Sequence, residues 1–457
     1  MNRKLLGQVA ISLYDRLSGR NVLAKKHVLT DDSNLSYDEN RIIQTGKLVD
    51  VLKHAFRTVP FYRETLSHLK LTFCQENALE TLQLFPIMSK NSLLENYENL
   101  HSSIKSYNVR EVTTGGSTGR PTVVLKDSYH IDWMVGAELL FYDWAGYYPG
   151  MKLLKIWGSE RDIFEGTLGT GNRVKNFLMN RDFINTFRLK NDQISEIFQA
   201  LKRYKSEAYL VYGYVESMYL ISKYFNDNKF EFPRPVAVLT TAGTLFPEMR
   251  HMIEQVFKCP VMNKYGCREI NSIACECPNM NGLHIPLRLN YIEILNNDNE
   301  PCAPGEVGEI AITSLTNYSM PLIRYKLGDM AKVALHGCDC NINFPVIDHI
   351  IGRTSDVFET KDGEFVHGEF FSHIFYDFPW VNKFRVIQES HLEFTIELEF
   401  QNQITDDQKQ NFETLIGGRI KKVFGQGSMI TFKYESELKV PASGKFRFTI
   451  SKVRKAA

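Results

Sequence analysis

The chain has 457 residues, of which 43% are hydrophobic and 23% charged, and its formal net charge is +1. This length exceeds what one compact core usually holds, so we expect two or more domains in an ordinary soluble globular protein. A net charge this close to zero would not attract nucleic acid or anionic lipid strongly, which disfavours a generic nucleic-acid binder.

Residues 1–20 combine basic and apolar positions, but Gln8, Ser12, Asp15 and Arg16 interrupt the apolar stretch. This pattern predicts an amphipathic first helix rather than a secretory signal. The chain contains no run of about 18 apolar residues, so we expect no membrane insertion. We therefore expect a cytoplasmic protein, as a monomer or homodimer.

Apolar spacing from about Leu35 to Leu100 predicts helices. A loop rich in glycine, serine and threonine follows at Thr113–Thr122. From there to about Cys259, strand patterns alternate with helical patterns such as ISEIFQALKRY, which predicts a sheet flanked by helices. The expected strands lie in LLKIWGS, AYLVYGY and PVAVLTTAG.

The later part of the chain changes character. Strands such as YIEIL and GEIAITSL, separated by turns with proline and glycine, predict a β-rich subdomain at about 260–350. After IGRTSDVF, strand patterns surround one helix, DQKQNFETLIGGRIKKVFG, which predicts a small α+β domain. We expect an α/β protein with a large N-terminal domain of helix-flanked sheets (1–356) and a small, mobile C-terminal α+β domain (357–457).

The loop at Thr113–Thr122 is a candidate phosphate site. Its glycines allow the backbone to turn N–H groups and hydroxyls onto the phosphates of a nucleotide. No Gly-Lys-Ser/Thr follows, so it is not a Walker loop, and a plain flexible turn is the alternative. The small and hydroxyl-bearing residues in question are Thr113, Thr114, Gly115, Gly116, Ser117, Thr118 and Gly119.

Four further strings carry nucleotide chemistry, in a fixed order. NKYGCREI offers Tyr265 as an aromatic platform and Glu269 as an oxygen ligand for magnesium. PLIRYKLGD ends in Asp329, a carboxylate able to accept from both ribose hydroxyls, and IGRTSD supplies the donor fork of Arg353. PASGKFRF places Lys445 where an ammonium can meet charge developing on the α-phosphate. Taken singly, such charges are more often solvated surface groups.

The loop and these strings in this order resemble the adenylate-forming superfamily of acyl-CoA synthetases, adenylation domains and luciferases. Within it, the chain is most similar to the phenylacetate–CoA ligase-like branch. That branch includes capsular-polysaccharide biosynthesis proteins and an enzyme that adenylylates a deazaflavin coenzyme. The resemblance runs from about Phe56 through Val453, which is nearly the whole chain.

The resemblance implies a role for each residue. Pyrophosphate oxygens of ATP would lie on Gly116, Ser117, Thr118 and Gly119. Tyr265 would stack on adenine beside Gly243 and Gly266, and Glu269 would hold magnesium. Asp329 and Arg353 would bind the ribose, and Lys445 would contact the carboxylate and the α-phosphate.

Two positions depart from the family pattern. Thr244 stands where the family commonly has Glu, which puts details of the pocket floor in doubt. Ser355 stands in the hinge where many members carry Asp or Lys, which leaves the control of domain rotation open.

The acyl pocket is expected at three strand ends, because open sheets usually bind ligands there. The residues expected to line it are Trp157, Tyr212, Gly213 and Ala242, with their neighbours Gly158, Ser159, Tyr214, Thr241 and Gly243. The aromatic residues are equally typical of an ordinary core. In a pocket, the tyrosines favour a planar or polar acyl group over a long alkyl chain.

Eight cysteines in a large chain indicate reduced thiols or a metal site rather than a disulfide framework. Cys277, His284, Cys338 and Cys340 form a Cys₃His set typical of structural zinc, and the phenylacetate–CoA ligase-like branch has a comparable pattern. Cys275 is the other candidate for the fourth ligand. Small buried side chains with an ordinary histidine are the alternative to a metal.

We expect ATP- and magnesium-dependent activation of a carboxylic acid, followed by acyl transfer to coenzyme A or to an amine or hydroxyl in surface-polysaccharide or secondary-metabolite biosynthesis. Arg419, Lys421 and Lys422 are basic candidates for coenzyme A, although such clusters are more often solvated helix faces. The alternatives are adenylylation of a hydroxyl on a coenzyme or sugar, and an inactive zinc-stabilised binding protein.

Overall fold

The computed structural model describes residues 3–104, 108–113, 122–157, 176, 179–186, 191–205, 207–353, 357–362, 365–367, 369–376, 378, 380–400, 405–439 and 446–453. Internal contacts divide the chain into two compact units. The first is formed mainly by residues 1–350, and the second by residues 351–457 together with 328–330. The expected α/β class with a small α+β C-terminal part is confirmed.

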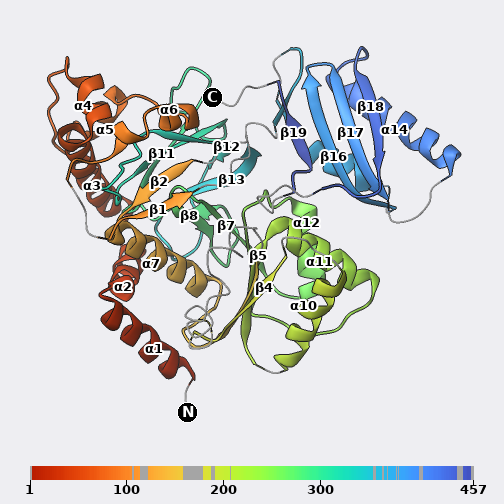
Figure 1. Ribbon diagram of the computed structural model, residues 1–457, viewed down its shortest axis with the longest axis horizontal. Helices are drawn as coiled ribbons and strands as arrows, with labels where there is room; N and C mark the ends of the chain where they lie inside the picture. Colours follow the sequence, from red (N-terminus) through yellow and green to blue (C-terminus); the bar gives the residue numbers. More distant parts are fainter. Residues whose placement is uncertain are drawn as a thin grey trace. The chain divides into compact units, whose positions relative to one another are not determined.

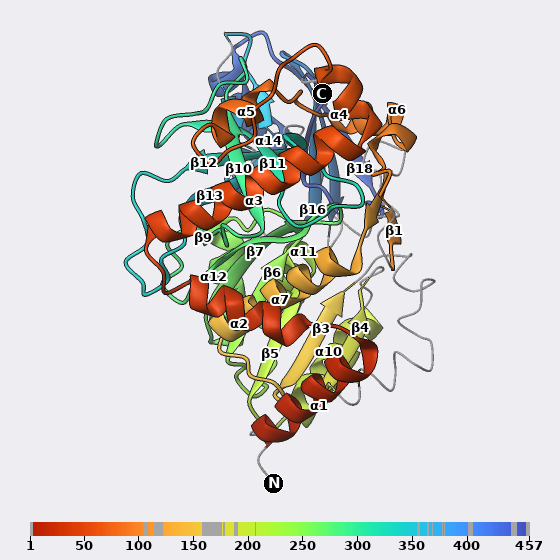
Figure 2. The ribbon, with the colours of Figure 1, turned by 90° about the vertical axis from the view of Figure 1, so that its left-hand side faces the viewer.

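The predicted N-terminal helices are confirmed. The longest, α3 (Tyr37–Thr58), begins with a capping box between Ser36 and Glu39, and its apolar face, which includes Leu48 and Val51, packs on strands of the central sheet (Figure 2). The other helical elements before the sheet are α1 (Arg3–Ser18), α2 (Val22–Asp32), α4 (Pro60–Leu66), α5 (Ala78–Leu84), α6 (Lys90–Glu95) and η1 (Glu98–Leu100).

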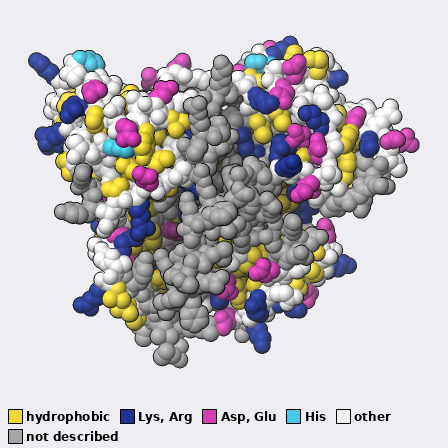
Figure 3. Space-filling model, in the orientation of Figure 1, with side chains coloured by type: hydrophobic (Ala, Val, Ile, Leu, Met, Phe, Trp, Pro, Cys, Tyr) yellow, Lys and Arg dark blue, Asp and Glu magenta, His cyan; other side chains and the backbone are white. Residues whose placement is uncertain are grey.

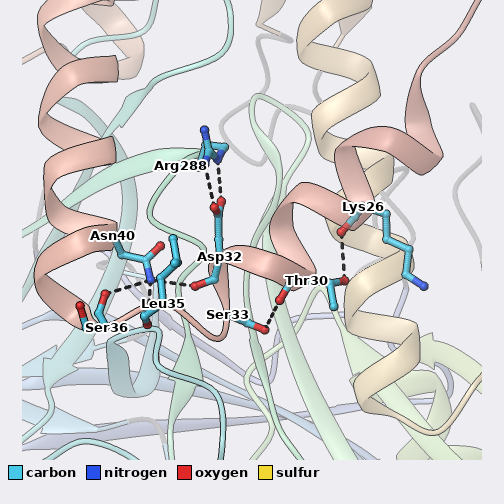
Figure 4. Close-up of polar contacts among 8 residues, drawn as sticks. All are labelled: Lys26, Thr30, Asp32, Ser33, Leu35, Ser36, Asn40 and Arg288. Carbon is cyan, nitrogen blue, oxygen red and sulfur yellow. Dashed lines mark hydrogen bonds and ion pairs between the residues drawn. The ribbon is translucent and has the colours of Figure 1, made fainter.

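Polar contacts hold the corner between α2 and α3 (Figure 4). Arg288 donates two hydrogen bonds to the Asp32 carboxylate, at 2.6 and 2.7 Å, and Asn40 donates to the carbonyl of Asp32 at 2.8 Å. The backbone of Asn343 donates to the carbonyl of Ser33 at 2.9 Å. The corner is therefore tied both to Arg288, which precedes β10, and to the loop that follows β12.

One eleven-stranded sheet is the centre of the first unit within the described ranges, with strand order β10-β11-β12-β13-β9-β8-β7-β6-β5-β3-β4. The β-rich stretch is thus continuous with the helix-flanked sheet rather than a separate layer. The strands are β3 (Lys152–Trp157), β4 (Arg181–Asn185), β5 (Tyr209–Tyr214), β6 (Ala237–Thr241), β7 (Val261–Cys267), β8 (Asn271–Glu276), β9 (Leu283–His284), β10 (Asn290–Leu295), β11 (Val307–Ser314), β12 (Tyr325–Val333) and β13 (Val346–Arg353).

Strand direction changes within this sheet at β7. Strands β4, β3, β5, β6 and β7 are parallel, whereas β7 pairs with β8, and β8 with β9, in antiparallel fashion. Helices cover both faces of the parallel half (Figures 1 and 2), with α2 and α7 (Ser128–Trp144) on one face. The other face is covered by α10 (Asn191–Arg203), α11 (Val215–Asp227) and α12 (Pro247–Phe257). Parallel strands need cover on both faces because they are buried on both.

A short two-stranded sheet precedes α7. Its strands, β1 (Arg110–Thr113) and β2 (Val123–Lys126), are antiparallel. They flank the predicted phosphate loop, of which residues 114–121 lie outside the described ranges.

The second unit has a core rich in phenylalanine, built on the four-stranded sheet β18-β17-β16-β19. Its elements are β14 (Val357–Glu359), β15 (Phe365–His367), α13 (Glu369–Tyr376), β16 (Val381–Ser390), β17 (Glu393–Phe400), α14 (Asp406–Phe424), β18 (Met429–Glu435) and β19 (Thr449–Ser451). On the face shown in Figure 3, basic and acidic side chains are interspersed, consistent with the balanced net charge. In the described part of the chain, no helix combines the length and apolarity that crossing a bilayer requires.

Candidate active site

The parallel half of the sheet has a topological switch point between β3 and β5. The chain runs from β3 to β4 on one side and then returns to place β5 on the other side of β3. Ligands of open α/β sheets usually bind at such a point, beyond the carboxyl ends of the strands. The last residues of the two strands are Trp157 and Tyr214.

Aromatic rings line this switch point. The Trp157 ring lies 4.4 Å from the Tyr214 ring and 5.1 Å from the Tyr212 ring, measured between centroids. Gly213 lies between the two tyrosines, and a Cβ atom there would lie only 3.0 Å from both the carbonyl oxygen of Ile156 and the sulfur of Met218. The structure therefore brings the predicted Trp157, Tyr212 and Gly213 together, and Gly213 is small because its neighbours leave no room.

The end of β6 supplies a second tight turn. Ala242 adopts a left-handed conformation, with φ of 69°, which costs free energy for a residue other than glycine. A Cβ atom on the adjacent Gly243 would lie 2.1 Å from a carboxylate oxygen of Glu216 in α11. The backbone after β6 thus passes closely over the start of α11.

Strand β7 carries the predicted nucleotide residues at its carboxyl end. Tyr265 is buried, and a β-bulge separates it from Gly266. The half-buried Glu269 follows in the turn before β8. Lys126, at the end of β2, holds this turn by donating to the carbonyl of Arg268 at 2.7 Å and to Asn271 Oδ1 at 2.8 Å. A half-buried carboxylate offers the hard oxygen ligand that magnesium prefers, so Glu269 fits the predicted ion.

The remaining predicted nucleotide residues lie on other strands or outside the described residues. Asp329 is half-buried in β12, and Arg353 is the last residue of β13. Gly116, Ser117, Thr118, Gly119 and Lys445 lie outside the described residues, as do Gly158, Ser159 and Ser355. Their roles stay predictions.

Sequence patterns missed a set of buried charges below the aromatic rings. We call Glu138, Tyr142, Lys155, Tyr212 and Lys264 the lysine–glutamate cluster. The Glu138 carboxylate accepts from the Tyr142 hydroxyl and from Lys155 Nζ, the latter at 3.4 Å. Lys264 Nζ donates to the Tyr212 hydroxyl at 3.1 Å. The available signal was a lysine inside each of two otherwise buried strands, LLKIW and VMNKYG.

The predicted zinc ligands Cys277, His284, Cys338 and Cys340 converge. Their ligand atoms all lie within 4.8 Å of one another. The sulfurs of Cys277 and Cys338 are 3.6 Å apart, and Cys340 Sγ lies 3.4 Å from His284 Nε2. Tetrahedral zinc with ordinary bond lengths requires about 3.8 Å between sulfurs and about 3.5 Å between sulfur and nitrogen. The donor set therefore fits zinc.

The surroundings of His284 select its ligand atom. Its Nδ1 atom lies 3.1 Å from the carbonyl oxygen of Phe344, which accepts the ring proton and leaves Nε2 free to bind a metal. Burial also lowers the pKa of His284, which favours the neutral ring that metals require. Cys275, the alternative fourth ligand, is not in the group that converges among the described residues; it packs in the core beneath α7.

The basic residues proposed for coenzyme A lie on one helix, α14. Arg419 donates to the carbonyl of Ile374 at 3.2 Å and so links α14 to α13, whereas Lys422 is exposed. Arg419 thus has a structural contact within the second unit.

Comparison with known proteins finds relatives of two kinds. Residues 358–452 match a family model described as the CapK C-terminal domain. Over 90% of its length the chain is 23% identical to Protein CapK of Staphylococcus aureus, covering 89% of that protein. Over 70% of its length it is 26% identical to phenylacetate–coenzyme A ligase of Escherichia coli, covering 73% of that enzyme. These relatives confirm the predicted similarity to the phenylacetate–CoA ligase-like branch of adenylate-forming enzymes.

The fold agrees with that assignment. A crystal structure of 2-hydroxyisobutyryl-CoA ligase in its postadenylation state superposes with a TM-score of 0.70 at 16% identity, covering 92% of this chain and 91% of that one. The chain therefore shares the fold of this ligase at low sequence identity.

Proposed function

We propose that this ligase activates a carboxylic acid with ATP and magnesium as an acyl-adenylate, releases pyrophosphate, and passes the acyl group to coenzyme A. The observation that carries the proposal is the position of an aromatic cluster at the switch point of a parallel sheet whose last strand, β7, leads into the Glu269 turn. Relatives named phenylacetate–coenzyme A ligase support both the acid and the acceptor.

The proposal gives each predicted site residue a role in binding ATP or in neutralising charge during the reaction. Glu269 would hold magnesium, which offsets the negative charge of the phosphates when bound. Tyr265 would support the adenine, and Asp329 with Arg353 would orient the ribose. Lys445 would lie against the carboxylate and the α-phosphate, where it neutralises charge as the oxygen attacks and pyrophosphate leaves. The loop with Gly116, Ser117, Thr118 and Gly119 would hold the leaving phosphates.

The cysteine–histidine set has a separate role in the proposal. A closed set of four protein ligands leaves no position for a substrate, so its zinc would be structural. It would fasten the loop bearing Cys338 and Cys340 to the β8–β9 hairpin.

The biosynthetic setting rests on similarity to protein CapK, which supports a place in surface-polysaccharide biosynthesis. Structures of 2-hydroxyisobutyryl-CoA ligase in complex with 2-HIB-AMP and CoA support coenzyme A over an amine or hydroxyl acceptor.

Carboxylate-dependent pyrophosphate release, with and without coenzyme A, tests the proposal. We expect release that requires a particular acid and falls by about 100-fold or more in Lys445→Ala, while ATP still binds by thermal shift. Unchanged release in Lys445→Ala contradicts the role of this lysine. A stable AMP-modified product formed without any carboxylate points instead to hydroxyl adenylylation.

A further inference from the structure

The lysine–glutamate cluster carries more positive charge than its own groups balance. Lys155 pairs with Glu138, but Lys264, of which only 8% is exposed, makes no ion pair in the described part of the chain. Its hydrogen bond goes to the neutral hydroxyl of Tyr212. Two ammonium groups therefore share one carboxylate in a largely buried environment. A buried charge without a partner costs free energy, and binding of an anion would reduce that cost.

The neighbouring charges shift the pKa of each ionisable group in the cluster. Burial by itself raises the pKa of Glu138, but Lys155 and Lys264 outweigh it and hold the pKa well below its usual range, so Glu138 is ionised. Burial by itself lowers the pKa of Lys264, but Tyr212 and Glu138 outweigh it and raise the pKa, so Lys264 is a cation. Burial lowers the pKa of Lys155, and an added anion would raise it again.

The cluster lies beside the aromatic rings of the switch point, on the same face of the sheet. Lys155 is two residues before Trp157 in β3, so both side chains leave the same face of the sheet, and Lys155 Nζ lies 5.8 Å from the Trp157 ring. Tyr212, directly across from Lys155 in β5, likewise precedes Tyr214 by two residues. Along the strands, the lysines therefore lie about 7 Å from the aromatic residues at the carboxyl edge.

Part of the lysine–glutamate cluster is accessible to solvent. The side chains of Lys155 and Glu138 keep 24% and 26% of their surface accessible, although α7 and the sheet enclose them. Aromatic rings flank Lys155: its Nζ atom lies 5.0 Å from the Tyr212 ring and 5.8 Å from the Trp157 ring. These features suit a short or planar tail ending in an anion, which would complete the charge of the cluster.

We propose that the acid activated by this chain carries a second carboxylate on its acyl tail, and that Lys155 and Lys264 bind it. The inference rests on the proposed function, because it names the substrate class of the same site. Glu138 then acts as the positioning residue that holds Lys155, and Tyr212 holds Lys264.

Matched acids test the substrate class without any variant. Pyrophosphate release is compared for butyrate against succinate, valerate against glutarate, and benzoate against terephthalate. We expect kcat/KM to be at least about tenfold higher for the dicarboxylate of a preferred pair, as a charge-assisted hydrogen bond provides. Equal or better use of the monocarboxylates overturns the inference and leaves the proposed function intact. If no acid in a wider carboxylate screen causes pyrophosphate release, both the dicarboxylate inference and the proposed function are overturned.

Variants then test the residues. Lys155→Met should lower kcat/KM for the preferred dicarboxylate by about 10–100-fold more than for its monocarboxylate partner, whereas Lys155→Arg should keep the preference. Lys152→Met is the matched control, because Lys152 lies in the same strand but pairs with Asp182 at 3.1 Å. An equal loss for both acids in Lys155→Met, or the same loss in Lys152→Met, contradicts the assignment.

Discussion

Two groups of polar side chains lie inside the first unit, and they differ in whether their members satisfy one another. The cysteine–histidine set brings four donor atoms within 4.8 Å, and the Phe344 carbonyl orients its histidine. The lysine–glutamate cluster instead leaves Lys264 without a carboxylate partner among the described residues. A closed set of this kind would add stability when it holds zinc, whereas the unmatched set is where we propose that a ligand binds.

Loss of a cysteine ligand should produce the largest change in stability. Binding of structural zinc contributes about 10–16 kcal/mol in small zinc domains, so Cys277→Ser should lose its zinc and unfold at a clearly lower temperature. Metal analysis and thermal unfolding of protein purified without chelator measure both. Cys74→Ser is the control, since Cys74 is half-buried and outside the set. Wild-type protein without zinc, or equal unfolding temperatures, would contradict a metal centre.

Glu269→Gln should show the opposite pattern, with a large effect on activity and a small one on stability. Loss of a magnesium ligand should lower pyrophosphate release by about 10²–10³-fold, comparable to the loss of one electrostatic contact in other active sites. Glu269 is only half-buried, so unfolding should change by less than about 1 kcal/mol. Full activity across a magnesium titration would rule out Glu269 as the ligand.

Gly266→Ala tests the turn between β7 and β8. Strand β7 carries Lys264 of the lysine–glutamate cluster, and Cys277 of the cysteine–histidine set follows β8. A Cβ atom at Gly266 would lie 2.1 Å from the backbone oxygen of Asn271, so the turn must shift at a cost of about 1–3 kcal/mol in the free energy of unfolding. Gly418→Ala in α14 is the control, where no atom lies within 4 Å and alanine should stabilise by roughly 0.5–1 kcal/mol. Chemical denaturation measures both, and equal effects would show that the turn has room.

The smallest expected effect concerns pH. Burial raises the pKa of Tyr212 from 10.0 to about 12, so the folded state favours the neutral phenol. This stabilisation is fully present below pH 10 and is lost as pH rises toward 12. Between pH 10 and 11 the wild type should lose about 1 kcal/mol more than Tyr212→Phe. Identical pH slopes in denaturant titrations would indicate a solvated hydroxyl.

Local patterns predicted most of the secondary structure. The apolar spacing of α3 and α14 and the strand patterns of β5, β10 and β16 correspond to the observed elements, because periodicity reflects which face of each element is buried. The phenylacetate–CoA ligase-like assignment, made from ordered motifs, is confirmed by the relatives. The domain boundary after Asp356 stays a prediction, since residues 354–356 lie outside the described ranges.

The sequence by itself determined the chemistry available to this protein: its family, the four zinc-type ligands, and the carboxylates and aromatic residues of the nucleotide strings. Only the tertiary structure decided which of these groups meet. It placed β5 beside β3 and so created the switch point, gathered His284 rather than Cys275 with the other ligands, and brought Glu138, Lys155 and Lys264 together from α7, β3 and β7. The physical reason is that strand pairing and helix packing join residues distant in the chain, and no local pattern records those contacts.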